Sequence, residues 1–198
     1  DNFYKENEDR MVFKTIYRLS NKELKKISKQ VNPLGMIALF NMPRPKKFIF
    51  KSKNVLILDN ISDPGNMGTI IRTADWFGFN HLFLSENCVE AYNSKVVAAS
   101  MGSVFNVSIN PEAKLKALIK DLKEEGYKIV VTDLMGDESN IDKKDKIALV
   151  IGNEAKGVDR KLISMADKRF KIMKSGKAES LNAAVAAGIV MNKIKLFK

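Results

Sequence analysis

The fold is decided by residues 55–77, which read VLILDNISDPGNMGTIIRTADWF. Residues 55–58 are a short, unbroken apolar run, which is typical of a strand buried on both faces of a parallel sheet. The polar stretch Asp63-Pro64-Gly65-Asn66 predicts a tight turn, because proline fixes φ and glycine tolerates positive φ. Residues 69–77 then predict a helix that ends at Gly78. Together they predict a strand, a polar loop and a helix in succession.

This alternation continues to the end of the chain. The clearest helix is expected at residues 112–125, where apolar residues recur at helical spacing and Gly126 follows. Further strands are predicted at 82–84, 104–109, 129–131, 148–151 and 170–173, and further helices at 94–99, 158–165 and 181–194. Apolar strands that alternate with helices predict an α/β fold, with a mainly parallel sheet and helices on both faces.

The first fifty residues have a different character. Ser20 and Glu23 have the spacing of a capping box, which predicts the start of a helix. The apolar run at residues 36–40 predicts a buried strand, and a proline-containing linker with the pair Lys46 and Lys47 follows it. We therefore expect two domains, formed by residues 1–50 and 51–198.

The positive charge of the chain is unevenly distributed. Its 198 residues carry a formal net charge of +11, and residues 1–53 hold 13 Lys and Arg against 5 Asp and Glu. A basic segment beside a nearly neutral domain favours a polyanionic partner. A solvated lysine-rich surface is the alternative interpretation of the same charge.

Other classes of protein are disfavoured by the composition. Cys88 is the single cysteine and cannot form an internal disulfide, which favours a reducing compartment and predicts a cytoplasmic location. No apolar run approaches the roughly 20 residues that a membrane span needs. His81 is the single histidine and has no cysteine or histidine partner at ligand spacing. We therefore expect neither a membrane nor a metal partner.

Two more polar stretches follow predicted strands. Residues 151–157 read IGNEAKG, in which Asn153 and Glu154 come directly after an apolar run. Gly152 and Gly157 allow a backbone to approach a ligand closely. Residues 180–184 read SLNAA, and Ser180 is expected to cap the last helix. Loops of this kind bind ligands at the carboxyl edge of α/β sheets.

The three polar stretches, in this order, resemble the signature motifs of the SpoU family of RNA ribose 2′-O-methyltransferases, within the SPOUT superfamily. The resemblance covers roughly residues 54–195. It implies a deep trefoil knot at the C-terminal end, S-adenosyl-L-methionine as cofactor, RNA as partner and a homodimer. Ribosomal RNA is favoured as the substrate, and transfer RNA is the alternative. Residues 1–48 look like the tail of the small RNA-binding domain that many family members carry upstream.

The resemblance also assigns roles to single residues. It places five residues at the catalytic centre: Asn66, Arg72, Glu154, Ser180 and Asn182. It places six in the cofactor pocket: Gly152, Asn153, Gly157, Ile172, Met173 and Leu181. Weaker RNA-binding candidates are Lys95, Ser100, Gly102, Lys46 and Lys47.

The identity of the proton acceptor is left open by these motifs. Family proposals have the arginine help to remove the proton of the ribose hydroxyl, but arginine stays protonated in proteins. We therefore expect Arg72 to orient the target phosphate and to stabilise developing alkoxide charge. Glu154 is a second candidate for taking the proton, directly or through water.

Two rival interpretations come from other functional classes. A non-catalytic RNA-binding relative would keep the fold, but the intact polar residues of the three motifs disfavour it. A nucleotide-binding α/β protein of another family would bind ATP or NAD. The sequence has neither a P-loop nor a glycine-rich dinucleotide fingerprint, which disfavours that interpretation.

Overall fold

The computed structural model describes residues 15–28, 35–45, 48, 50, 54–137 and 145–196. The chain forms two compact units, Asp1–Met42 and Pro43–Lys198. In the first unit, helix α2 (Asn21–Ile27) begins with the predicted capping box. The Ser20 side chain accepts a hydrogen bond from the Glu23 backbone, and the Glu23 carboxylate accepts one from the Ser20 backbone at 2.8 Å.

The buried strand expected at residues 36–40 is a wrong prediction. These residues form no strand, and Leu39 and Phe40 are 97% and 67% exposed. An apolar run becomes a strand only by pairing with another strand, and the described part of this unit offers none. An apolar run by itself is therefore not enough to predict a strand.

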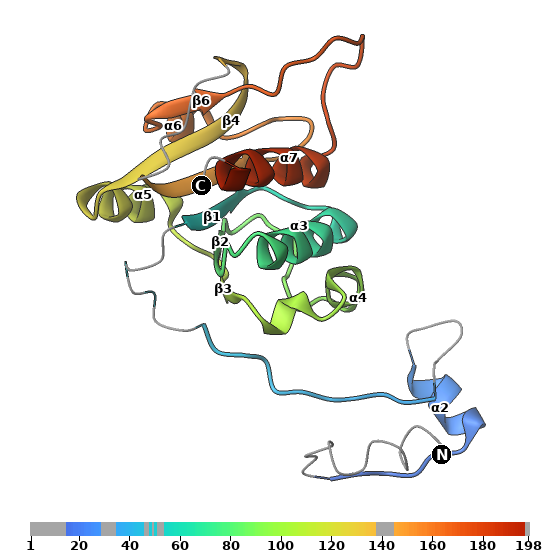
Figure 1. Cartoon of the computed structure of the whole chain (residues 1–198). Coiled ribbons are helices and arrows are strands. Elements are labelled where there is room, and N and C mark those ends of the chain that lie inside the picture. Colours follow the sequence, from blue (N-terminus) through green and yellow to red (C-terminus); the bar gives the residue numbers. More distant parts are fainter. Residues whose placement is uncertain are drawn as a thin grey trace. The chain divides into compact units, whose positions relative to one another are not determined.

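The second unit is built on a six-stranded sheet in which every neighbouring pair is parallel (Figure 1). The strand order is β3-β2-β1-β5-β4-β6. The strands are β1 (Asn54–Asp59), β2 (His81–Leu84), β3 (Ser108–Asn110), β4 (Tyr127–Asp137), β5 (Lys146–Gly152) and β6 (Lys168–Phe170). The two central strands, β1 and β5, pair along their whole shared length and end together at Asp59 and Gly152.

Helices cover both faces of this sheet, as predicted (Figure 1). Leu56 and Leu58 of β1 belong to one core, which is covered by α3 (Pro64–Trp76), α4 (Ser94–Ser100) and α7 (Ala183–Leu196). Val55 and Ile57 belong to the other core, which is covered by α5 (Leu115–Glu124) and α6 (Arg160–Ile163). All six residues of β1 are buried, which explains the unbroken apolar run. The trefoil knot that the resemblance implies stays a prediction.

Two predicted strands are shorter than the sequence indicated. In place of the strand predicted at residues 104–109, the structure has the short strand β3 at Ser108–Asn110. The residues before it, Ser103–Phe105, form a 3-10 turn. Within residues 170–173 the strand ends at Phe170, so Ile172 and Met173 lie in the segment that follows β6. β3 and β6 are the two edge strands of the sheet. Each pairs with one neighbouring strand only, and both are short.

The amino end of the sheet is closed by aromatic side chains. The Phe48 ring lies 4.8 Å from Phe50, 5.2 Å from Phe83 and 6.4 Å from Tyr127, centroid to centroid. Phe48 and Phe50 thus pack with the second unit, although the first expected domain, residues 1–50, includes both. That residues 1–50 carry part of an RNA-binding domain stays a prediction.

Candidate functional site

The three polar stretches meet at the carboxyl edge of the sheet. The first joins β1 to α3, the second follows β5, and the third precedes α7. β1 and β5 are neighbours, and α3 packs beside α7 on the same face. Segments that are far apart in the sequence are therefore brought to one place by the parallel sheet.

A chain of side-chain hydrogen bonds links one residue from each stretch. The Asn182 amide donates from Nδ2 to Asn66 Oδ1 at 2.8 Å. Asn66 in turn donates from Nδ2 to the Glu154 carboxylate at Oε1. Asn66 uses both ends of its amide, so it fixes the positions of Glu154 and Asn182 relative to each other. Three of the five residues assigned to the catalytic centre are thereby brought together.

Asn66 is held by the start of α3, which corrects the expected tight turn. Pro64 occupies the first turn of the helix, and Asp63 is the N-cap. The Asp63 carboxylate accepts a hydrogen bond from the Asn66 backbone at 2.7 Å. Proline is favoured at this position because the first backbone N–H groups of a helix have no partner within the helix. Asn66 is therefore fixed to a helix and does not lie in a loop.

Asn182, and not Ser180, caps α7. The Asn182 Oδ1 accepts hydrogen bonds from the backbones of Ala184 at 2.9 Å and Val185 at 3.3 Å. The same amide gives its Nδ2 to Asn66. Asparagine can cap and bridge at once because it carries both an acceptor and donors, whereas a serine hydroxyl is shorter. Ser180 is exposed and lines the pocket described below.

The second stretch is a closed loop pinned to the first. Asn153 accepts hydrogen bonds at Oδ1 from the backbones of Ala155 (2.9 Å) and Lys156 (3.2 Å), and donates from Nδ2 to the Asn60 carbonyl at 3.1 Å. A Cβ on Gly152 would lie 2.4 Å from the Gly157 backbone, so a side chain there is excluded. Gly157 has a φ of 67°, which favours glycine.

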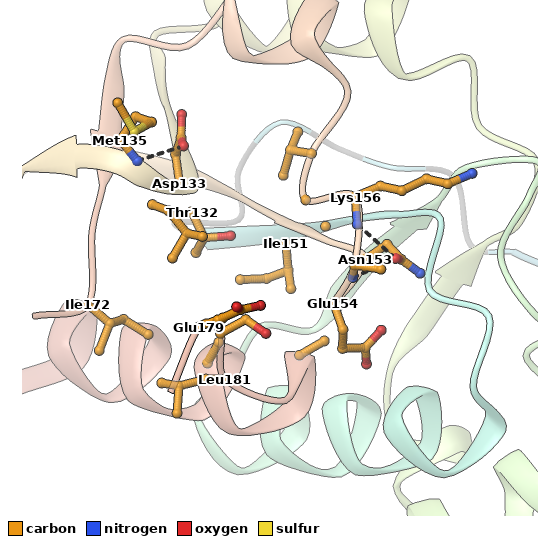
Figure 2. A pocket seen from close by; sticks show the side chains of 18 of the residues that line it. Thr132, Asp133, Met135, Ile151, Asn153, Glu154, Lys156, Ile172, Glu179 and Leu181 are labelled. Atoms are coloured by element: carbon orange, nitrogen blue, oxygen red, sulfur yellow. Dashed lines mark hydrogen bonds between the residues drawn. The ribbon is translucent and has the colours of Figure 1, made fainter. Parts of the chain in front are cut away.

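A pocket of about 640 Å³ opens between the second and third stretches and the end of β4 (Figure 2). Its lining includes all six residues assigned to the cofactor pocket: Gly152, Asn153, Gly157, Ile172, Met173 and Leu181. Glu154 and Ser180 line it as well. Figure 2 shows the apolar side chains of Ile151, Ile172 and Leu181 around one part of it, with Glu154 to one side.

The shape and chemistry of the pocket fit S-adenosyl-L-methionine. Its volume lies within the range of about 300–1,000 Å³ that is usual for small-ligand sites. Apolar side chains suit an adenine ring, and Gly157, which has open space where a Cβ would be, allows a ligand to approach the backbone closely. The Glu154 carboxylate supplies a negative charge, which suits a sulfonium ligand.

The end of β4 contributes residues that the motifs did not indicate. Thr132, Asp133 and Met135 line the pocket. Asp133 accepts hydrogen bonds from Arg169 Nε at 2.7 Å and from the Met135 backbone at 2.9 Å, so its carboxylate is fixed. The sequence contained one indication of this role: Thr132 and Asp133 are polar residues that directly follow the predicted strand at 129–131. That strand lies beside the strand that precedes Asn153.

Arg72 lies apart from the hydrogen-bonded residues. It is exposed on α3 and is not among the pocket-lining residues. It follows Asn66 by six positions, which places its Cα about 9 Å further along the helix. Side chains on a helix lean toward the amino end, so the long Arg72 side chain leans toward the turn that carries Asn66. Arg72 therefore faces solvent, where a large substrate could reach it.

The weaker RNA-binding candidates have different settings. Lys95 is exposed in the first turn of α4, and Gly102 lies in an exposed turn with a φ of 91°. Ser100 is fully buried, and its hydroxyl donates to the Val97 carbonyl at 2.8 Å. This arrangement does not present Ser100 to RNA, and packing explains it instead. Lys46 and Lys47 lie outside the described residues.

The described residues show neither a metal-binding cluster nor a membrane-spanning helix. They contain no group of three or more His, Cys, Asp or Glu side chains that could hold a metal ion. Among the same residues, no helix has the length and apolar character needed to cross a membrane.

The fold and the site define an α/β protein with a nucleoside-sized pocket at the carboxyl edge of a parallel sheet. The model of the SpoU rRNA Methylase family matches residues 53–192. The chain belongs to this family of RNA methyltransferases.

Named relatives agree with this membership. The chain is 34% identical over 177 residues to the 23S rRNA (guanosine(2553)-2′-O)-methyltransferase RlmP of Bacillus subtilis, covering 88% of this chain and 70% of that protein. A solved structure of a TrmH-family protein from Porphyromonas gingivalis matches with a TM-score of 0.80 and 30% identity, over 88% of this chain and 71% of that one. The AdoMet-bound rRNA methyltransferase from Sinorhizobium meliloti matches with a TM-score of 0.68 and 36% identity, over 72% of this chain and 56% of that one.

Proposed function

We propose that this protein transfers a methyl group from S-adenosyl-L-methionine to a ribose 2′-hydroxyl in structured RNA, with ribosomal RNA as the favoured substrate. The observation that carries the proposal is the hydrogen-bonded chain Asn182–Asn66–Glu154 at the rim of the pocket. It joins all three family motifs beside a cavity of suitable size. The protein's single cysteine, Cys88, supports a cytoplasmic location.

The cofactor would supply a methyl group that is already activated by its positive sulfur. Ile172 and Leu181 would pack on the adenine, and Gly152 and Asn153 would contact the ligand through their backbones. The reaction forms an O–C bond at the ribose 2′-oxygen and breaks the S–C bond of the cofactor. The proton of the hydroxyl passes to Glu154, directly or through water. Asn66 holds that carboxylate in place.

Arg72 serves the RNA side of the reaction. Its exposed guanidinium can grip the phosphate next to the target ribose and stabilise negative charge on the 2′-oxygen. Basic groups elsewhere, including the 13 Lys and Arg of residues 1–53, would attract the RNA backbone. Binding should therefore weaken as salt is raised.

A homodimer is the second part of the proposal. The outer faces of α3 and α7 expose Trp76, Val185 and Ile189, at 84%, 50% and 41%. The two helices pack side by side, so these residues belong to one surface. A second copy of the chain would bury this apolar face. Analytical ultracentrifugation should give a dimer for the wild type and a monomer for Trp76→Glu; a wild-type monomer at micromolar concentration would contradict this part.

The activity is tested by incubating the purified protein with methyl-labelled cofactor and total RNA from a strain that lacks it. Label in ribosomal RNA at one mapped ribose 2′-oxygen is the expected result, and Asn66→Ala should abolish it. Label in transfer RNA would select the alternative substrate. Calorimetric binding of the cofactor without any methyl transfer would instead indicate a non-catalytic RNA-binding relative.

A further inference from the structure

A buried carboxylate lies behind the site and has no part in the mechanism described so far. Asp59 is the last residue of the central strand β1, opposite Gly152 of β5 in the sheet register. It is 3% exposed. Its Oδ2 accepts a hydrogen bond from the Asp159 backbone at 2.9 Å, and its Oδ1 accepts one from Asn60 Nδ2 at 2.9 Å.

The surroundings of Asp59 do not favour its charge. Burial raises the pKa of Asp59 and is the largest cause; the nearby carboxylate of Asp159 raises it as well, whereas hydrogen bonds from the Asp159 backbone and the Ser85 side chain lower it. The thiol of Cys88, whose own pKa is raised by burial and also by Asp59, is the other titratable group that acts in this cluster. The Ser85 hydroxyl accepts a hydrogen bond from the Asn60 backbone at 2.9 Å. A buried carboxylate whose charged form is made costly by burial points to a role other than stability.

Two of the hydrogen bonds of Asp59 hold both ends of the loop that carries Glu154. The far end is held directly, through the Asp159 backbone, at the start of α6. The near end is held through Asn60, whose carbonyl accepts from Asn153 Nδ2 at 3.1 Å. Asn60 has a left-handed φ of 59°, a conformation that its bond to Asp59 helps to retain. Glu154 lies between these two fixed ends.

We propose that Asp59 is a positioning residue, which fixes the loop from Asn153 to Asp159 and so holds Glu154 against Asn66. This inference rests on the proposed function, in which Glu154 takes a proton. Only an ionised carboxylate offers acceptors on both oxygens to the two N–H donors, the Asp159 backbone and Asn60 Nδ2. Loss of either tie weakens the hold on one end of the loop, and small displacements of a catalytic group are costly to rate.

The test is Asp59→Asn in the full chain, with Asn54→Ala as the control. The amide of Asp59→Asn keeps the shape but has one acceptor, so one tie is lost. We expect kcat to fall about 30-fold, with the KM for the cofactor changed less than about threefold. The melting temperature should stay the same or rise. Asn54, 5% exposed at the opposite end of β1, should show the reverse: lower stability and unchanged kcat.

A second readout does not depend on methyl transfer. Amide hydrogen exchange at residues 153–159 should become at least about tenfold faster in Asp59→Asn, while exchange in β1 and β5 stays the same. Unchanged loop exchange, or a loss of activity that follows a loss of stability, would overturn the positioning role. An inactive wild type with the expected exchange pattern would overturn the proposed function and leave the loop attachment standing.

Discussion

The two ends of the same parallel sheet are closed in different ways. At the amino end, Phe48 packs against Phe50, Phe83 and Tyr127 through ring contacts. At the carboxyl end, the closure is made by hydrogen bonds between polar side chains and backbones from three separate loops. The first end is a half-buried aromatic cluster, whereas the second contains a pocket.

The difference shows how stability and function are divided in this fold. Ring packing is only weakly directional, so it stabilises the sheet without fixing one position to a fraction of an ångström. Hydrogen bonds contribute little net stability but depend steeply on distance and angle. Changes at the carboxyl end should therefore alter rate, and changes at the amino end should alter stability.

The largest effect is expected for Glu154→Gln. The amide can still accept the hydrogen bond from Asn66, so the local geometry is kept, but it cannot take a proton. We expect kcat to fall about 1,000-fold, within the range found for loss of a general base, with little change in melting temperature. Steady-state kinetics with RNA substrate measure this. Glu124→Gln, on α5, is the control and should behave as the wild type.

Arg72→Lys should have the next largest effect. Lysine keeps the charge but loses the planar fork that can hold a phosphate through two hydrogen bonds. We expect kcat to fall about 100-fold, while cofactor affinity is unchanged because Arg72 does not line the pocket. Kinetics and calorimetry separate the two quantities. Arg160→Lys, exposed on α6, is the matched control, and near-normal turnover of Arg72→Lys would contradict the bidentate role.

Phe48→Ala tests the other end of the sheet, the amino end. Removing the ring takes away one aromatic contact from each of Phe50, Phe83 and Tyr127. We expect the free energy of unfolding to fall by about 2 kcal/mol, less than for a fully buried ring, with kcat unchanged at 25 °C. Chemical denaturation measures the loss. Phe105→Ala, at a half-exposed position, should cost less; a large fall in kcat for Phe48→Ala would refute the division between the two ends.

The sequence predicted well what depends on neighbouring residues. Unbroken apolar runs located β1 and β5, and the motif residues located the loops at their carboxyl ends. It failed where a distant partner decides the outcome. Asn182 is preferred to Ser180 as the cap because its amide also reaches Asn66, 116 positions away. A pattern of neighbouring residues cannot reveal a contact between residues so far apart in the sequence.

Two other failures have the same cause. The run at residues 36–40 had the composition of a strand but lacks a pairing strand in the described part of its unit. Thr132 and Asp133 were missed because β4 runs on to Asp137, past a register irregularity in its pairing with β6. Strand ends are set by the neighbouring strand, so the full lining of the pocket required the structure.

The smallest expected effect is a pH dependence of stability at the carboxyl end. The pKa of Asp59 is raised in the folded protein, chiefly by burial. Its contribution is therefore fully present below the unfolded-state pKa of about 3.9 and is lost as pH rises through the folded-state pKa. Asp59→Asn should match the wild type near pH 4 and become the more stable protein toward pH 8, as measured by urea denaturation at each pH. A difference in stability between Asp59→Asn and the wild type that does not vary with pH would mean that Asp59 is ionised at no cost.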